Sequence, residues 1–241
     1  MMFFDPRGNS IQCGQWLRSY EPYYFLNGPT LGRRINGRNQ SSRFVENQVC
    51  ALLTQVPRLS RQDLSLAMAW KIGGIVDHRR SEADQEIIYR QELWLQTLSA
   101  KNQFGILDFS ESIPLLAREM DTILNQIQQG NPQYVFDLTH RLNAFGNVYI
   151  LTALFFISKG KYPIYDKFSH IAAQAIHQDL PPGSYVRYRG LQKWGDYLQY
   201  LALLDSIHSG CPQQSEDRSM SIPRREDRSL WSYGHFFKSD L

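Results

Sequence analysis

The sequence predicts an all-α protein, because apolar residues recur at three- and four-residue spacing in segment after segment. Gly and Pro break this pattern at regular intervals, and we find no convincing run of alternating strand residues and no internal repeat. The predicted helices cover Arg43–Leu53, Arg61–Ile72, Glu82–Ser99, Glu111–Gln129, Pro132–Leu142, Asn147–Ser158, Lys167–His177 and Gln192–Ser209.

The two ends of the chain lie outside this helical pattern. The first forty or so residues are rich in Gly, Pro, Asn and Arg, which predicts irregular or short elements. Cys211 to Arg228 is polar with balanced charges, and we expect a mobile loop there. The final aromatic cluster, Leu230–Phe237, must dock onto the fold or onto a ligand.

Composition favours a globular protein and permits a polyanionic partner. Hydrophobic residues make up 42% of the 241 residues and charged residues 20%, which is enough to bury a core. The net charge is only +3, but six arginines precede Phe44, against Asp5 and Glu21. Such a local excess could hold phosphates, although a solvated basic face explains it as well.

The cysteines and the apolar segments indicate a soluble cytoplasmic protein. Cys13, Cys50 and Cys211 are few, odd in number and far apart, so they predict neither a disulfide framework nor a four-cysteine iron–sulfur cluster. We therefore expect a reducing compartment. The longest apolar stretch, Val148–Ile157, is ten residues long and too short to span a bilayer.

The most informative region runs from Pro132 to Ile176. A helical segment is followed by the four-residue turn Asn143–Gly146 and then by a helix that is apolar almost all round and hence buried. The turn would present the backbone N–H groups of the next helix's first residues to solvent. Unpaired amides and the positive end of the helix dipole bind phosphate, which makes Gly146, Asn147 and Val148 candidate phosphate ligands.

Asp166 follows at the start of the next predicted helix. Pro163 forces an extended segment before it, and an aspartate in this position is a natural helix N-cap. On the residue alone, a purely structural cap is the favoured interpretation.

The order turn–Gly–apolar helix–Pro–x–x–Asp–helix resembles the signature of the helix-hairpin-helix DNA glycosylases. Leu142-Asn143-Ala144-Phe145-Gly146 is similar to the family's hairpin, and Tyr162-Pro163-Ile164-Tyr165-Asp166 to the segment that carries its catalytic aspartate. The spacing of twenty residues from Gly146 to Asp166 is close to that of the 8-oxoguanine glycosylase branch. The resemblance covers about 45 residues, from Pro132 to Ile176.

The resemblance implies a two-lobed helical fold formed by residues 1–241 as one glycosylase-like domain. It also implies a monomer that binds double-stranded DNA, flips a modified base out of the helix and hydrolyses its glycosidic bond. Asp166 would be the catalytic carboxylate. The remaining assignments are Phe145, Gly146, Asn147, Val148 and Lys167 for DNA binding and Trp231, Tyr233 and His235 for the base pocket.

The sequence also departs from the family pattern. Ala144 replaces the first hairpin glycine, and Asn147 stands at or beside the position where bifunctional members carry a nucleophilic lysine. We therefore expect a monofunctional hydrolase with no metal and no cofactor. Oxidised or alkylated bases are the first substrate class, and the modified cytosines removed by a bacterial anti-phage subgroup are the second. A non-catalytic helix-hairpin-helix DNA-binding module is the alternative.

Overall fold

The structure is a computed structural model, and the chain divides into two compact units, which we describe separately. Unit 1 combines Met1–Gln40 with Tyr165–Leu241, and unit 2 is Ser41–Ile164. The described residues are 1–29, 41–77, 79–98, 109, 111–142, 146–211 and 224–239, together with the backbone at 101–102 and 105–106.

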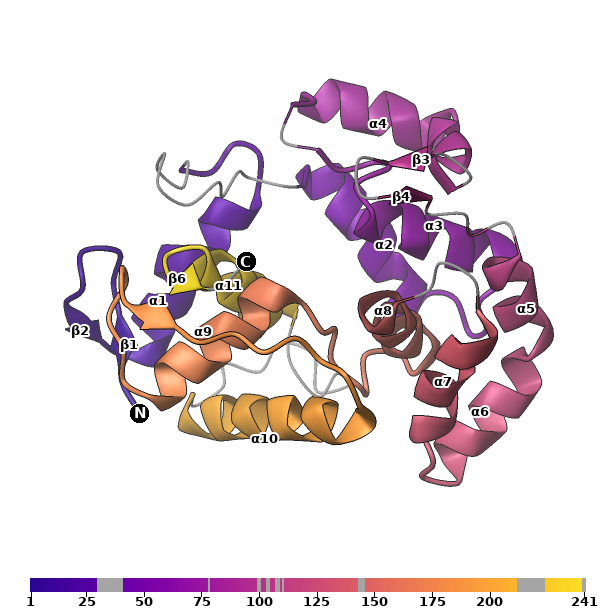
Figure 1. The fold of residues 1–241 in the computed structure, drawn as a ribbon. Helices are drawn as coiled ribbons and strands as arrows, with labels where there is room; N and C mark the ends of the chain where they lie inside the picture. The colour runs from indigo at the N-terminus through magenta and orange to yellow at the C-terminus, as the bar shows by residue number, and fades with distance from the viewer. Residues whose placement is uncertain are drawn as a thin grey trace. The chain divides into compact units, whose positions relative to one another are not determined.

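Unit 2 consists almost wholly of helices, as the spacing of apolar residues predicts (Figure 1). Two of the longer helices begin at side-chain caps: Ser42 and Ser60 each accept a hydrogen bond from the backbone of the following turn. The helices of unit 2 are α2 (Arg43–Thr54), α3 (Arg61–Lys71), α4 (Glu82–Arg90), η2 (Leu93–Leu98), α5 (Ser112–Arg118), α6 (Met120–Gln128), α7 (Gln133–Asp137), η3 (Leu138–Arg141) and α8 (Asn147–Ile157).

Helix α8 forms the centre of unit 2. Eight consecutive residues from Ile150 to Ile157 are buried, which confirms the expectation from its apolar sequence. It packs against α3 and α7, with the rings of Phe156 and Trp70 5.9 Å apart and perpendicular. Thr152 satisfies its buried hydroxyl by donating to the carbonyl of Val148 at 2.9 Å.

Three of the predicted helices are each split in two. The Glu82–Ser99 helix ends at Arg90, since Glu92 adopts a left-handed φ of 53° that an α-helix cannot contain. The Glu111–Gln129 helix is interrupted at Glu119, and the last turn of the Pro132–Leu142 helix tightens into η3. A two-residue antiparallel pair joins β3 (Lys101–Asn102) to β4 (Gly105–Ile106).

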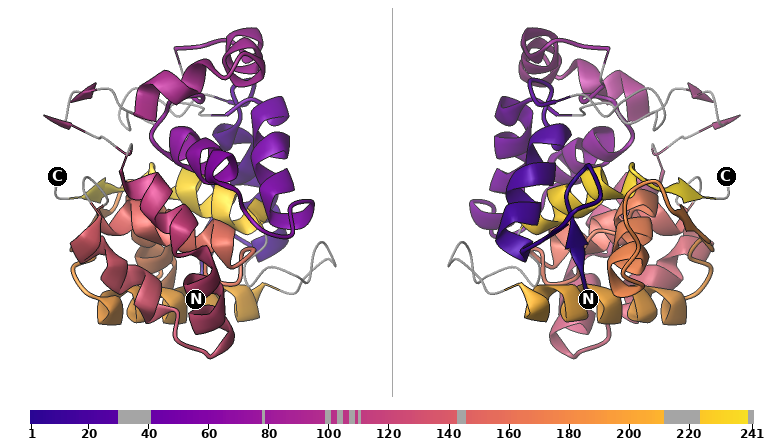
Figure 2. Two further views of the ribbon diagram at one scale, coloured as in Figure 1. Left: turned by 90° about the vertical axis from the view of Figure 1, so that its right-hand side faces the viewer. Right: turned by 90° about the vertical axis from the view of Figure 1, so that its left-hand side faces the viewer.

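Unit 1 is built on helix α9, which packs against α10 and α11 (Figure 1). The right-hand view of Figure 2 shows α11 between α1 and α9, in agreement with its contacts to both. The elements of unit 1 are β1 (Phe3–Phe4), β2 (Ser10–Ile11), α1 (Cys13–Tyr20), η1 (Glu21–Tyr24), α9 (Lys167–His177), β5 (Tyr185–Val186), α10 (Trp194–Gly210), α11 (Arg224–Gly234) and β6 (Lys238–Ser239).

The mostly helical fold is thus confirmed, and in the described residues the strands form only two-residue pairs. Two α-helices of unit 1 lie outside the predicted segments. Helix α1 lies in the segment expected to be irregular, and α11 begins at Arg224, inside the loop expected from Cys211 to Arg228. Residues 212–223 of that loop lie outside the described residues.

Ion pairs explain why α11 begins so early. Arg225 and Arg228 both bind the Glu21 carboxylate of η1, and Arg224 donates to the hydroxyl of Tyr24 at 2.9 Å. These partners are about 200 positions away in the sequence, so a local pattern of charged residues cannot reveal them.

The cysteine expectation is wrong for two of the three residues. Cys13 at the start of α1 and Cys211 at the end of α10 form a disulfide, with 5.5 Å between their Cα atoms, and Cys50 is free. The bond closes a loop of 198 positions, a separation that gives no signal in the sequence. None of the helices in the described part of the chain is long and apolar enough to cross a membrane.

Candidate active site

Asp166 is the N-cap of α9, as the sequence predicts. Its backbone is extended, with φ −141° and ψ 147°, and its Oδ1 accepts the N–H of Phe168 at 2.9 Å. The side chain is half-buried, whereas Pro163, Ile164 and Tyr165 before it are buried. The cap therefore fixes the orientation of one carboxylate oxygen at the surface of unit 1.

His235, the first residue after α11, lies near Asp166 and is stacked on Phe168. The two rings have centroids 3.5 Å apart and an angle of 22° between their planes. Burial lowers the pKa of His235 to about 4, while the hydrogen bond to Trp231 and the charge of Asp166 act in the opposite direction. The ring is thus neutral at pH 7. Nδ1 is 2.8 Å from the carbonyl oxygen of Trp231, which can only accept, so Nδ1 carries the proton.

Gly234 allows α11 to approach α9 closely enough for this stacking. A Cβ atom at Gly234 would lie 1.9 Å from the carbonyl oxygen of Phe168, far inside van der Waals contact. A glycine at this position therefore sets the distance between the first turn of α9 and the end of α11, and so the position of His235 next to Asp166.

Tyr165, Tyr188 and His170 form a hydrogen-bonded network close to Asp166. The Tyr165 hydroxyl is 3.0 Å from the Tyr188 hydroxyl and 3.0 Å from Nδ1 of His170. Burial lowers the pKa of His170 to about 4, so this imidazole is also neutral at pH 7. Burial raises the pKa of Tyr188, and the negative charge of Asp166 contributes to that increase.

The other residues predicted for the base pocket occupy different environments. Trp231 is half-buried and packs on His235, with 4.1 Å between ring centroids, and on Tyr24. Tyr233 is fully buried among Trp16, Tyr20 and Phe237, so its ring belongs to the core of unit 1. Of the three predicted residues, His235 is the one whose pKa responds to the charge of Asp166.

The predicted phosphate ligands lie at the start of α8, in unit 2. Gly146 is the N-cap, exposed and extended with φ −73°, and a Cβ atom there would meet nothing within 4 Å. Asn147 and Val148 are half-buried in the first turn, and Phe145 lies outside the described residues. Lys167, the first residue of α9, is in unit 1, where its Nζ lies 5.4 Å from the centre of the Tyr188 ring.

Two tyrosines that lie near Asp166, Tyr188 and Tyr200, have no signal in the sequence. Tyr188 and Tyr200 come from later segments, and their proximity to Asp166 depends on how α10 and the chain after β5 pack on α9. The one local signal was Tyr165, which is adjacent to the aspartate in the sequence.

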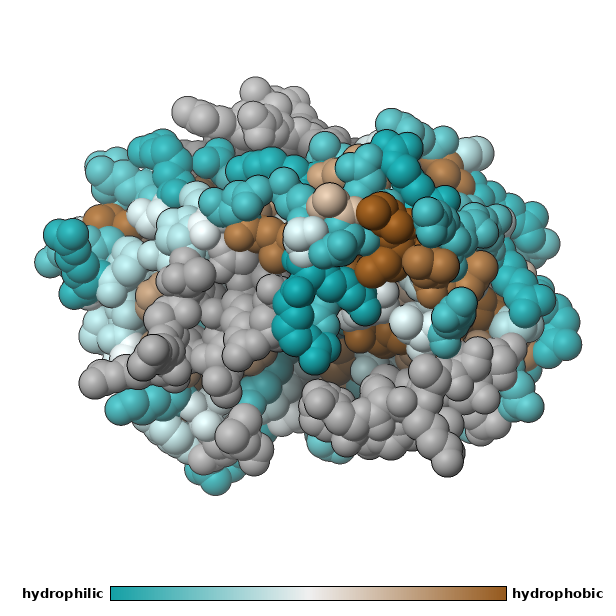
Figure 3. All heavy atoms as spheres, turned by 90° about the horizontal axis from the view of Figure 1, so that it is seen from above, coloured by the Kyte–Doolittle hydropathy of each residue, from teal (hydrophilic) through white to brown (hydrophobic). Residues whose placement is uncertain are grey.

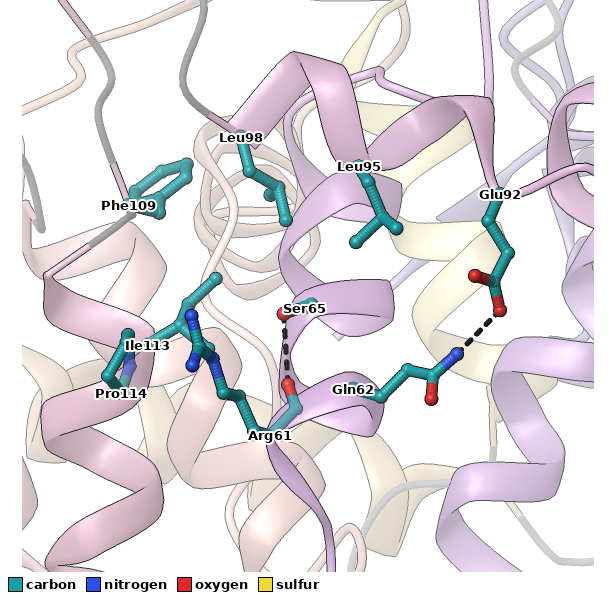
Figure 4. Close-up of a pocket in the computed structure, with 9 residues that line it drawn as sticks. All are labelled: Arg61, Gln62, Ser65, Glu92, Leu95, Leu98, Phe109, Ile113 and Pro114. Carbon is teal, nitrogen blue, oxygen red and sulfur yellow. Dashed lines mark hydrogen bonds between the residues drawn. The ribbon is translucent and has the colours of Figure 1, made fainter.

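Unit 2 contains a separate pocket of about 520 Å³ (Figure 4). Leu95, Leu98 and Phe109 contribute apolar walls, and two other lining residues are joined by a hydrogen bond from Gln62 to the Glu92 carboxylate at 2.5 Å. None of the catalytic, DNA-binding or base-pocket residues predicted from the sequence is among the residues described as lining this pocket.

Unit 2 also has exposed hydrophobic side chains, among them Leu93. Figure 3 shows hydrophobic side chains among hydrophilic ones on the face of the molecule seen from above.

Comparisons with known proteins return no match to a family model, to a curated protein or to a solved structure.

Proposed function

We propose that this chain is a monofunctional DNA N-glycosylase of the helix-hairpin-helix superfamily, with the two-lobed fold of that superfamily and Asp166 as its catalytic carboxylate. It would bind double-stranded DNA as a monomer in the bacterial cytosol or nucleoid. The proposal rests on the residue pattern from Pro132 to Ile176. The structural observation that supports it most strongly is the half-buried Asp166 carboxylate, which is held at the start of α9 near the neutral, buried His235.

The chemistry needs a negative charge close to the sugar. Cleavage of a glycosidic bond passes through an oxocarbenium-like sugar cation, which a fixed carboxylate stabilises. The Phe168 N–H holds Oδ1 of Asp166 in place, so the carboxylate needs little reorganisation when the positive charge develops. In this proposal Asp166 also orients the attacking water.

The neutral state of His235 supports the same assignment. A protonated imidazole beside Asp166 would neutralise the carboxylate and weaken its attraction for a cationic sugar. Burial lowers the pKa of His235 to about 4, so the Asp166 charge is not compensated by this ring at pH 7. The Phe168 ring, stacked on His235, covers one face of the imidazole.

The start of α8 would hold the DNA backbone. The open space around Gly146 lets a phosphate approach the helix N-terminus, where the helix dipole favours an anion. Such a contact positions the duplex without reading its sequence. Because Asn147 stands where bifunctional relatives would carry a lysine, the product would be an intact abasic site.

Incubation with a panel of DNAs tests the function. Duplexes with single oxidised or alkylated bases, and genomic DNA of phages with modified cytosines, would be treated with the protein and then with an abasic-site endonuclease. Mass spectrometry of the small-molecule fraction identifies the base that is released. The proposal predicts release of one class of base and a strand break only after the endonuclease. A protein that binds these DNAs but releases no base would be a DNA-binding module instead.

A further inference from the structure

From Tyr185 to Arg189, along β5 and the residues that follow it, exposed side chains alternate with less exposed ones. Strand β5 pairs in parallel with β6, with Tyr185 opposite Lys238 and Val186 opposite Ser239. Tyr185, Arg187 and Arg189 are exposed, whereas Val186 is buried and Tyr188 is half-buried. Alternate residues of an extended chain point to opposite sides, so the three exposed side chains share the solvent-facing side.

Tyr188 anchors this segment beside Asp166. Its hydroxyl is 3.0 Å from the Tyr165 hydroxyl, which is itself 3.0 Å from Nδ1 of buried His170. Nζ of Lys167 lies 5.4 Å from the centre of the Tyr188 ring. The side of the segment that carries Tyr188 is thus fixed near the start of α9. Figure 1 shows β5 and the chain that follows it beside α9.

The solvent-facing side carries positive charge. Within the described residues, no ion pair joins Arg187, Arg189 or Lys238 to a carboxylate, whereas Arg225 and Arg228 of the same unit both bind Glu21. Tyr185, opposite Lys238, is 55% exposed. We call these four residues the basic stripe: Tyr185, Arg187, Arg189 and Lys238.

We infer that the basic stripe binds the sugar–phosphate backbone of the DNA strand whose base Asp166 acts on. Arginine forms paired hydrogen bonds with phosphate oxygens, and residues two apart in an extended chain are about 6.6 Å from each other, a spacing comparable with that of successive phosphates along a strand. The exposed Tyr185 ring offers an apolar face for a sugar or an unstacked base. The inference rests on the proposed function, because it assigns the stripe to the same substrate as Asp166.

Salt-dependent binding tests the stripe without any need for catalysis. The probe is a fluorescent duplex with a tetrahydrofuran abasic analogue, titrated at several salt concentrations. For R187Q/R189Q we expect Kd to rise about tenfold at ~0.15 M salt and the slope of log K against log salt to shrink by about 1.8, since each lost phosphate contact contributes about 0.9. The matched control is R58Q/R90Q, which removes the same charge from two exposed arginines of unit 2 that have no predicted role in DNA binding.

A second variant tests the anchor. Tyr188→Phe keeps the ring and the net charge but removes the hydroxyl that holds the segment to Tyr165. We expect weaker binding with an unchanged salt slope, because the arginines remain but are less well placed. Wild-type binding by Tyr188→Phe would contradict the anchoring step.

The outcomes separate this inference from the proposed function. A folded R187Q/R189Q protein with the wild-type Kd and salt slope overturns the stripe, even if the wild-type protein releases base. An equal loss in R58Q/R90Q also overturns it, because the effect would then be one of net charge. If the wild-type protein releases no base but binding depends on Arg187 and Arg189 as described, the stripe stands and the glycosylase proposal fails.

Discussion

Buried His170 should make the stability of unit 1 strongly dependent on pH. Its side chain is 8% exposed, and burial lowers its pKa from 6.5 to about 4, with a smaller opposing effect from the charge of Asp196. Between these two values the unfolded chain binds a proton that the folded protein does not, so acid favours unfolding. The stabilisation is complete above pH 6.5 and is lost as the pH falls towards 4.

The size of the effect follows from the two pKa values. Each tenfold difference in proton affinity is worth about 1.4 kcal/mol, so the fall from 6.5 to about 4 corresponds to about 3 kcal/mol of unfolding free energy. Since a domain of this size is stable by about 5–15 kcal/mol, such a loss is easily measured. His235 has the same predicted behaviour, because burial also lowers its pKa to about 4.

Urea unfolding at a series of pH values between 7 and 4.5 measures this dependence. His170→Gln keeps a hydrogen-bonding side chain next to Tyr165 but cannot be protonated, so its stability should fall less steeply with acid than that of the wild type. His177, exposed in the last turn of α9, provides the control, and His177→Gln should keep the wild-type steepness. Equal acid sensitivity of His170→Gln and the wild type would refute the assignment of a neutral, buried His170.

Three further predictions concern the packing of α9, the start of α8 and the reaction product. Gly234→Ala should lower the unfolding free energy by at least 1–3 kcal/mol in urea denaturation, because its Cβ would overlap the Phe168 carbonyl; an unchanged midpoint would contradict the close approach. Gly146→Glu should weaken binding to all duplexes in fluorescence anisotropy, because it adds a negative charge where a phosphate would bind; wild-type affinity would remove the start of α8 from the interface. Borohydride should trap little covalent adduct on DNA, because Asn147 occupies the nucleophile position, and efficient trapping that one lysine substitution abolishes would show a lyase.

The sequence predicts best those elements whose signals are local. The bounds of α9 follow from Asp166 as a cap and from apolar residues repeating along one face, and α8 follows from an almost continuous apolar run. The sequence does not predict helix α11, because the first half of this helix is charged and is stabilised by residues far away in the sequence, such as Glu21. The disulfide between Cys13 and Cys211 likewise depends on how α1 and α10 meet in space.

The same distinction between local and long-range signals applies to the candidate site. The cap at Asp166 is a property of one turn of chain and was predicted from the residues around it. The neutral state of His235 and the Tyr188–Tyr165–His170 network depend on burial and on contacts between segments far apart in the sequence. Burial of an aromatic ring cannot be distinguished from pocket lining in the sequence, which is why Tyr233 was assigned to a pocket but lies in the core.

The rate of base release by Asp166→Asn tests the central claim most directly. Asn caps a helix about as well as Asp, so the fold should be kept while the negative charge is lost. In single-turnover assays on the substrate identified by the panel, we expect base release to fall by a factor on the order of a hundred or more, with DNA affinity unchanged or higher. Asp63→Asn is the control, because Asp63 accepts the Ser60 N–H in the capping box of α3, and it should react at the wild-type rate. Wild-type base release by Asp166→Asn would mean that Asp166 only caps α9 and would contradict the account.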